Sequence, residues 1–152
     1  MREQAPQRSQ ELFKSGYFCA ESVLLAISEN QGIHSDLIPR IASGFCSGIS
    51  RTGGMCGAVS GAMMGINLVA GRNSPTDSLE TSYSLTQKLI DQFVGQFGSI
   101  NCRQLIGCDL ATEAGLRYFM ENNLMERCLQ CAADATSIAV SLIDELHSST
   151  TT

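Results

Sequence analysis

The sequence predicts an all-α protein, a single-domain helical bundle in which a glycine-rich loop leads into a glycine-rich central helix. Apolar residues recur at intervals of three and four along most of the chain, and no segment shows the period of two that is typical of a half-buried strand. Glycines stand where the periodic segments stop. The length suits one domain, so we expect a single domain over residues 1–152, with disorder at 1–5 and 147–152.

The first third of the chain predicts three helices, each followed by a glycine. They cover residues 6–14, 18–29 and 36–42, and the glycines that end them are Gly16, Gly32 and Gly44. Either Ser35 or Asp36 can cap the third of them, because a short polar side chain accepts a hydrogen bond from the first free backbone N–H groups. Apolar residues fall on one side of the second helix, which indicates the face that it buries.

A loop over residues 44–54 with four glycines leads into the helix predicted for 55–69, which closes at Gly71. Gly57, Gly61 and Gly65 share one face of this helix. Each costs about 1 kcal/mol of helix propensity relative to alanine, but bare glycines allow another helix to approach closely. We expect tight helix packing there, and the same approach makes room for a cofactor or a partner thiol near Cys56.

The second half of the chain predicts four more helices, over residues 76–97, 102–106, 112–121 and 125–146. Ser74 and Pro75 open the first of them, and Gly98 and Gly107 end the first and second. The helix over 76–97 carries an apolar stripe made of Leu79, Tyr83, Leu85, Leu89, Ile90, Phe93 and Phe97. This stripe is wider than one core-facing side needs, which predicts a homodimer.

Composition and charge exclude two classes of partner. The net charge is −5 and the ten Lys and Arg residues are scattered, so there is no basic surface for nucleic acid. Residues 52–71 carry no charge over 20 positions, but six of them are glycines, which favours a buried helix over a membrane span. The N-terminus lacks the apolar segment of a secretory signal, so we expect a reducing cytoplasm, where structural disulfides are rare.

Seven cysteines make thiolate chemistry the leading hypothesis for function. Cys56 is the strongest candidate because it stands where the glycine-rich loop enters a helix. A helix N-terminus offers free N–H groups and a partial positive charge, which favours a thiolate that attacks disulfides or binds metals. A single free cysteine is nevertheless most often a small buried apolar residue, so inert buried thiols remain an alternative.

The pair Cys128 and Cys131 forms the one Cys-x-x-Cys motif. Residues i and i+3 share a helix face, which suits a dithiol or two metal ligands, but a thioredoxin site would need a strand–helix unit that the sequence lacks. Covalent heme attachment is excluded because Ala132 stands where histidine is required. Neither His34, in a predicted loop, nor His147, in the tail, is a strong candidate ligand.

Four segments together resemble one known family. They are Cys19-Ala20-Glu21-Ser22-Val23, the stretch from Gly44-Phe45 to Cys56-Gly57-Ala58-Val59-Ser60-Gly61-Ala62, Cys102-Arg103-Gln104-Leu105-Ile106-Gly107, and Cys128 at the head of the last helix. In this order they resemble the C-GCAxxG-C-C family, described as redox-active, from about Leu12 to Leu146. The local sequence Met-Cys-Gly-Ala departs from the Gly-Cys-Ala of the family name.

The resemblance implies an all-α fold and a functional set of Cys19, Cys56, Cys102 and Cys128. The family is similar to the non-heme part of split-Soret cytochromes, whose cysteines are associated with an iron–sulfur cluster. Cys46, Cys108 and Cys131 then look peculiar to this chain, although the choice of Cys128 over Cys131 rests only on spacing.

Three hypotheses follow. In the first, the four family cysteines hold an iron–sulfur cluster for electron transfer with a redox partner that the sequence does not identify, or zinc in a structural role. In the second, there is no metal: Cys56 is the catalytic thiol that attacks a disulfide, and Cys19, Cys102 or Cys128 resolves the product. In the third, the chain is a helical interaction module with inert buried cysteines.

Overall fold

The computed structural model describes residues 4–150, and that part of the chain consists of helices joined by turns and loops, without a β-strand. Its elements are α1 (Gln4–Lys14), α2 (Cys19–Asn30), the 3-10 helix η1 (Arg40–Phe45), α3 (Cys46–Arg51), α4 (Gly57–Ala70), α5 (Glu80–Phe97), α6 (Cys102–Ile106), α7 (Glu113–Glu121) and α8 (Met125–Thr150). The predicted all-α bundle is confirmed.

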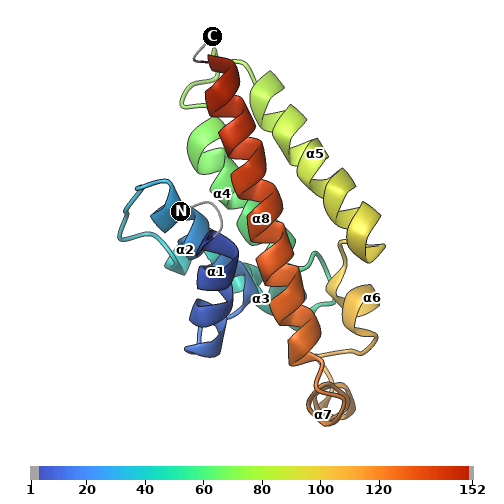
Figure 1. Ribbon diagram of the computed structural model, residues 1–152. Helices are drawn as coiled ribbons and strands as arrows, with labels where there is room; N and C mark the ends of the chain where they lie inside the picture. The colour runs from blue at the N-terminus through green and yellow to red at the C-terminus, as the bar shows by residue number, and fades with distance from the viewer. Residues whose placement is uncertain (1–3, 151–152) are drawn as a thin grey trace.

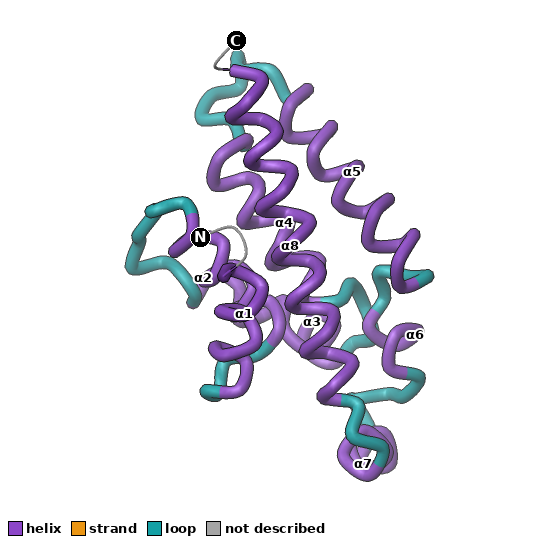
Figure 2. The backbone as a smooth tube through the Cα atoms, viewed as in Figure 1, coloured by secondary structure: helices purple, strands orange, loops and turns teal. Residues whose placement is uncertain are grey.

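The bundle is built around α4 and α8. α8 runs along the whole molecule, α5 lies on one side of it, and α1 and α2 lie on the other (Figure 1). α4 contacts α2, α5 and α8, which makes it the central helix that the sequence predicts. Loops join the helices at both ends of the bundle, and α7 projects at the lower end (Figure 2).

The core lies where α4 and α8 meet α1, α2 and α5. The fully buried residues include Val59 and Ile66 from α4, Leu89 and Phe93 from α5, and Val140 and Ile143 from α8. The predicted stripe on α5 therefore faces the core through Leu85, Leu89 and Phe93, while Tyr83 is 58% exposed.

The glycine face of α4 lies directly against α2. A Cβ atom on Gly61 would lie 2.6 Å from the carbonyl oxygen of Ala20, and one on Gly65 would lie 2.7 Å from Cδ1 of Ile27. The expected tight packing is confirmed. The close approach also brings Cys19, the first residue of α2, against Gly57, the first residue of α4.

Two predicted helix boundaries need correction. The helix expected over 36–42 is wrong, because that segment forms turns that lead into η1. Pro39 accounts for this difference, since it has no N–H to donate and restricts the residue before it. α5 begins at Glu80 rather than at residue 76, because a turn from Ser74 to Asp77 comes first.

The expected disorder at the two ends is not found in the residues that the structure describes. Gln4 and Ala5 belong to α1, where Ala5 is only 3% exposed, and residues 147–150 continue α8. Residues 1–3 and 151–152, which were included in the same expectation, lie outside the described part of the chain.

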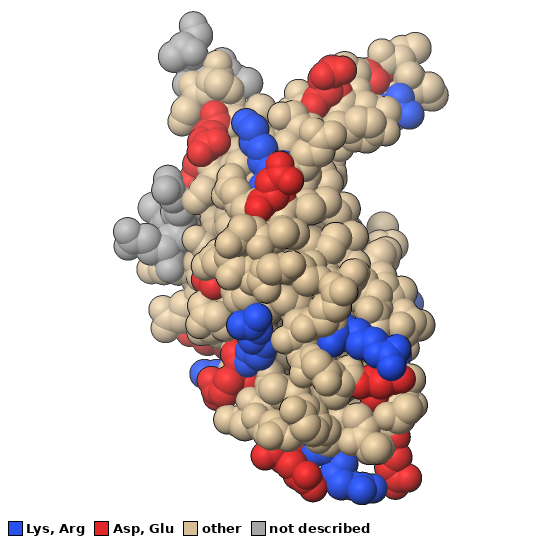
Figure 3. Space-filling model, turned by 90° about the vertical axis from the view of Figure 1, so that its right-hand side faces the viewer, with Lys and Arg blue, Asp and Glu red and all other residues tan. Residues whose placement is uncertain are grey.

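Within residues 4–150 no helix is long and apolar enough to cross a membrane. On the face that Figure 3 shows, the lysine and arginine side chains stand singly, most of them near aspartates or glutamates, and broad uncharged areas separate them.

Candidate functional site

Cys56 is the N-cap residue of α4, as the sequence predicts. Its carbonyl oxygen accepts the N–H groups of Val59 at 3.0 Å and Ser60 at 3.1 Å, which closes the first turn of the helix. The backbone N–H groups of Ala58 and Val59 also donate to its sulfur. The thiol of Cys56 therefore lies at the positive end of α4, in a residue that is only 8% exposed.

A short antiparallel pairing brings Cys102 to the same place. Cys56 donates its N–H to the carbonyl oxygen of Ile100 at 2.6 Å, and Cys102 donates its N–H to that of Gly54 at 2.8 Å. The two segments form an isolated bridge between Met55 and Asn101. Because this bridge ties the start of α4 to the start of α6, cysteines far apart in the sequence lie close together.

The glycine-rich loop forms an unusual turn beside these cysteines. Ser47, Gly48, Ile49, Ser50 and Arg51 all have positive φ values, between 54° and 70°, so α3 is a left-handed helical turn. Residues other than glycine disfavour this conformation by about 1–2 kcal/mol each. Such strain is typical of positions that the surrounding structure holds for function.

Gly48 is the residue of this turn at which a side chain would collide with Cys102. A Cβ atom on Gly48 would clash with Cβ of Cys102 and lie 3.0 Å from its Sγ and 3.4 Å from the carbonyl oxygen of Gly54. Its carbonyl oxygen also accepts the N–H of Gly54 at 3.0 Å. The loop was predicted from its glycines, and Gly48 shows why one of them is needed: Cys102 packs directly on its backbone.

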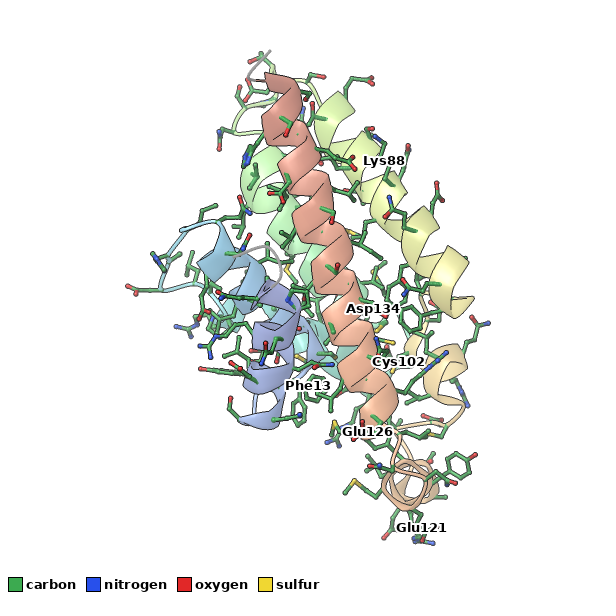
Figure 4. The ribbon with its side chains drawn as sticks, viewed as in Figure 1. Phe13, Lys88, Cys102, Glu121, Glu126 and Asp134 are labelled. Carbon is green, nitrogen blue, oxygen red and sulfur yellow. The ribbon has the colours of Figure 1, made fainter. Side chains whose placement is uncertain are left out.

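α8 contributes the other thiols of this site. Cys131, which is 2% exposed, packs in the same buried cluster as Cys56, and Cys128 lies half-buried one turn earlier on the same helix. Cys102, the first residue of α6, lies beside the lower half of α8 (Figure 4). We call Cys56, Cys102, Cys108, Cys128 and Cys131 the thiol cluster.

The environment of Cys56 opposes the thiolate that the sequence led us to expect. The hydrogen bond to Cys131 and then burial raise the pKa of Cys56 well above its usual range, and the N–H groups of Ala58 and Val59 lower it by less. The predicted helix N-terminus is present, but its effect is smaller than that of the neighbouring thiol and of desolvation. The prediction of a thiolate-biased Cys56 is therefore wrong for the reduced protein.

Burial also raises the pKa of Cys102, Cys108 and Cys128. Burial raises the pKa of Cys102 to about 11, and negative charge on Cys56 or Cys108 adds to the effect. Burial raises the pKa of Cys128 to about 12, with contributions from Cys56, Cys102 and Cys108 and a smaller opposing one from Arg127. The thiols of the cluster are therefore close enough that charge on one disfavours charge on the next.

Cys19 lies on the other side of Gly57 and pairs with Cys46. Cys19 packs against the buried cluster that contains Cys46, and its sulfur accepts the N–H of Ser47 at 3.4 Å. The hydrogen bond to Cys19, followed by burial, raises the pKa of Cys46. The close approach of α2 and α4 places the sulfur of Cys19 against Gly57, the residue after Cys56.

The arrangement does not form a ready site for a single metal ion. Among the described residues, no three His, Cys, Asp or Glu side chains are close enough to hold one. A tetrahedral zinc site would need four donors about 2.3 Å from one point. An iron–sulfur cluster is wider, and Cys56, Cys102 and Cys128 have the right donor atoms for it, whereas the contacts of the Cys19 thiol are to Cys46 and Ser47.

Two thiols at the site, Cys46 and Cys131, lie outside the set of functional cysteines that the motifs predict. Cys131 carried a usable signal, because its i+3 spacing from Cys128 puts both on one helix face. Cys46 carried only its position in the glycine-rich loop. Each packs in the same cluster as a cysteine of the family set, Cys131 with Cys56 and Cys46 with Cys19.

The chain was compared with known proteins in three ways. No curated protein and no solved structure matches it. A family model with the description "Putative redox-active protein (C_GCAxxG_C_C)" matches residues 17–142, which include all seven cysteines. This match covers most of the chain and agrees with the resemblance carried by the cysteine motifs, so the protein belongs to the C_GCAxxG_C_C family of redox-active proteins.

Proposed function

We propose that this protein performs reversible thiol–disulfide chemistry, with Cys56 and Cys131 as its redox pair. The observation that carries the proposal is the packing of these two buried thiols in one cluster at the N-terminus of α4, where Cys131 raises the pKa of Cys56. Two sulfurs in contact can form a disulfide with little movement of the backbone. Cys131 thereby takes the resolving role that the sequence assigned to Cys19, Cys102 or Cys128.

The reaction transfers two electrons from the protein to a disulfide substrate. Cys56 loses its proton and attacks one substrate sulfur, so that a mixed disulfide forms and the other substrate sulfur leaves as a thiolate. Cys131 then loses its proton and attacks Sγ of Cys56, which releases the second substrate thiolate. The two released protons convert the substrate thiolates into thiols, and the protein keeps a Cys56–Cys131 disulfide.

The environment of the pair favours a reductant. A low thiol pKa stabilises the reduced form and makes a disulfide oxidising, and the raised pKa of Cys56 has the opposite effect. We expect a reduction potential nearer to about −270 mV, the value for thioredoxin, than to about −120 mV, the value for DsbA. Because its pKa is raised, the thiol of Cys56 should react slowly at neutral pH.

Disulfide mapping tests the proposal directly. Trypsin cleaves after lysine and arginine, so Cys56 falls in peptide 52–72 and Cys131 in peptide 128–152. Mild oxidation should link these two peptides in the natural protein and in Cys128→Ser, but not in Cys131→Ser. A link that survives Cys131→Ser and disappears in Cys128→Ser would overturn the assignment of the pair.

An iron–sulfur cluster is the second candidate, favoured by the crowding of the thiol cluster. Charge on Cys56 raises the pKa of Cys102 and of Cys128, and charge on Cys102 raises that of Cys128 as well. A cationic iron centre would relieve this repulsion by binding the thiolates. When bound, the cluster would supply one-electron transfer. Anaerobic reconstitution with iron and sulfide should give visible absorption and stoichiometric iron if this candidate holds; colourless protein without iron would reject it.

A further inference from the structure

We propose a second redox site in this protein, formed by Cys19, Cys46 and Glu21, in which Cys19 attacks a disulfide substrate and Cys46 resolves it with Glu21 as the proton acceptor. This site is separate from the Cys56–Cys131 pair, because it lies on the α2 side of Gly57 and uses different thiols. It assigns a role to Cys46, which the family motif does not include.

The exposure of the two thiols sets the order of their reactions. Cys19 is half-buried, whereas Cys46 is only 6% exposed, so an external disulfide meets Cys19 first. The sulfur of Cys19 accepts the N–H of Ser47, the residue after Cys46, at 3.4 Å, and Cys19 packs against the buried cluster that contains Cys46. Cys19 is therefore the attacking sulfur, and the buried Cys46 is the resolving one.

Glu21 is placed to take the proton of Cys46. Its Oε1 lies 3.6 Å from Sγ of Cys46, and the other acceptor near that thiol is the carbonyl oxygen of Ala42 at 3.8 Å. The carboxylate is held in position from two sides. Oε1 accepts the N–H of Phe18 at 3.2 Å, and Oε2 accepts the hydroxyl of Ser43 at 2.8 Å.

The reaction balances without any further reactant. Cys19 loses its proton and attacks the substrate disulfide, a Cys19 mixed disulfide forms, and the first substrate sulfur leaves as a thiolate, which takes up that proton. Cys46 gives its proton to Glu21 and attacks Sγ of Cys19, which releases the second substrate thiolate and leaves a Cys19–Cys46 disulfide. The substrate gains two electrons, and the protons from the two cysteines convert its sulfurs into thiols.

The test uses the full chain with oxidised glutathione as the probe. Samples are quenched at intervals with acid and digested with trypsin, which places Cys19 in peptide 15–40 and Cys46 in peptide 41–51. Mass spectrometry then follows glutathione on peptide 15–40 and the cross-link between 15–40 and 41–51. Neither peptide contains another cysteine, so this readout does not depend on the Cys56–Cys131 pair.

We expect glutathione to appear on peptide 15–40 first and the cross-link to follow. Glu21→Gln keeps the size and accepting oxygen of the side chain but removes the proton acceptor, so it should prolong the mixed disulfide by about 100-fold, a typical general-base contribution. Cys46→Ser should keep the mixed disulfide permanently. In both variants glutathione should still appear on peptide 15–40, because Cys19 is unchanged.

Glu29→Gln is the matched control, because it removes the same charge from the same helix at a site where Glu29 pairs with Arg8 instead. If the mixed disulfide has the same lifetime in Glu21→Gln and in Glu29→Gln, Glu21 is not the proton acceptor. If peptide 41–51 never cross-links to 15–40, or glutathione reaches 41–51 before 15–40, the assignment of this site is wrong.

Discussion

Gly61→Ala should destabilise the protein, although alanine is the better helix former. Its Cβ would lie 2.6 Å from the carbonyl oxygen of Ala20 and 3.1 and 3.2 Å from the Cα and C atoms of the same residue. All three atoms belong to the backbone of α2, so the two helices must move apart. Overpacking of this kind costs about 1–3 kcal/mol, and the gain in helix propensity offsets about 1 kcal/mol of it.

Gly95→Ala is the matched control for this prediction. Gly95 lies inside α5, and a Cβ atom there would meet nothing within 4 Å. This change should therefore stabilise the protein by about 0.5–1 kcal/mol, since only helix propensity changes.

Thermal unfolding followed by circular dichroism compares the two variants. One kcal/mol corresponds to about 2–4 °C for a domain of this size, so Gly61→Ala should lower Tm by several degrees and Gly95→Ala should raise it slightly. An equal rise of Tm in both variants would refute the close approach of α2 and α4.

Three further predictions concern the thiols and the assembly. Folding raises the pKa of Cys102 to about 11 and that of Cys128 to about 12, so the unfolded chain loses these protons at a lower pH than the folded protein. The free energy of unfolding, measured by denaturant titration, should therefore be constant below about pH 9 and fall between about pH 9 and 12. A profile that stays flat over this range would contradict the burial of these thiols. Cys56→Ser should abolish reversible oxidation of the thiol cluster with little change in helical circular dichroism. Cys108→Ser should leave that oxidation intact. Equal loss of oxidation in both variants would show that Cys56 is not the reactive thiol of the cluster. The chain should form a homodimer through the exposed side of α5 around Tyr83, and light scattering that finds only the 16.3 kDa species would reject this.

Much of the helical frame could be predicted from the sequence because local signals dominate it. Gly98 and Gly107 adopt the left-handed conformation that ends α5 and α6, and Thr112 accepts the N–H of Gly115 at the start of α7. The glycine spacing of α4 likewise predicted a close approach, since few other roles account for three glycines on one helix face.

The site could be predicted only in part, because its contacts join distant segments. Helix ends were visible at Cys19 and Cys56, but the hydrogen bonds from Cys56 to Ile100 and from Cys102 to Gly54 depend on tertiary structure. The left-handed turn of α3 could not be foreseen either, since Ser47 and Ile49 give no local preference for positive φ.

The pKa of Cys56 shows a further limit of sequence reasoning. The helix N-terminus that favours a thiolate can be read from the sequence, but the opposing neighbour Cys131 lies 75 positions away and is known only from the fold. The sign of a pKa shift depends on the sum of such effects, so the motif alone predicted it wrongly.

The most direct test of the central claim is a redox titration of the linked peptides 52–72 and 128–152. Reduced protein is equilibrated anaerobically in buffers of defined thiol–disulfide potential, quenched with acid, and mapped after tryptic digestion. We expect one reversible two-electron transition, in which the ratio of linked to free peptide changes tenfold for about every 30 mV. Its midpoint should lie nearer to the reduction potential of thioredoxin than to that of DsbA. Absence of this cross-link at every potential would contradict the claim that Cys56 and Cys131 form a redox pair.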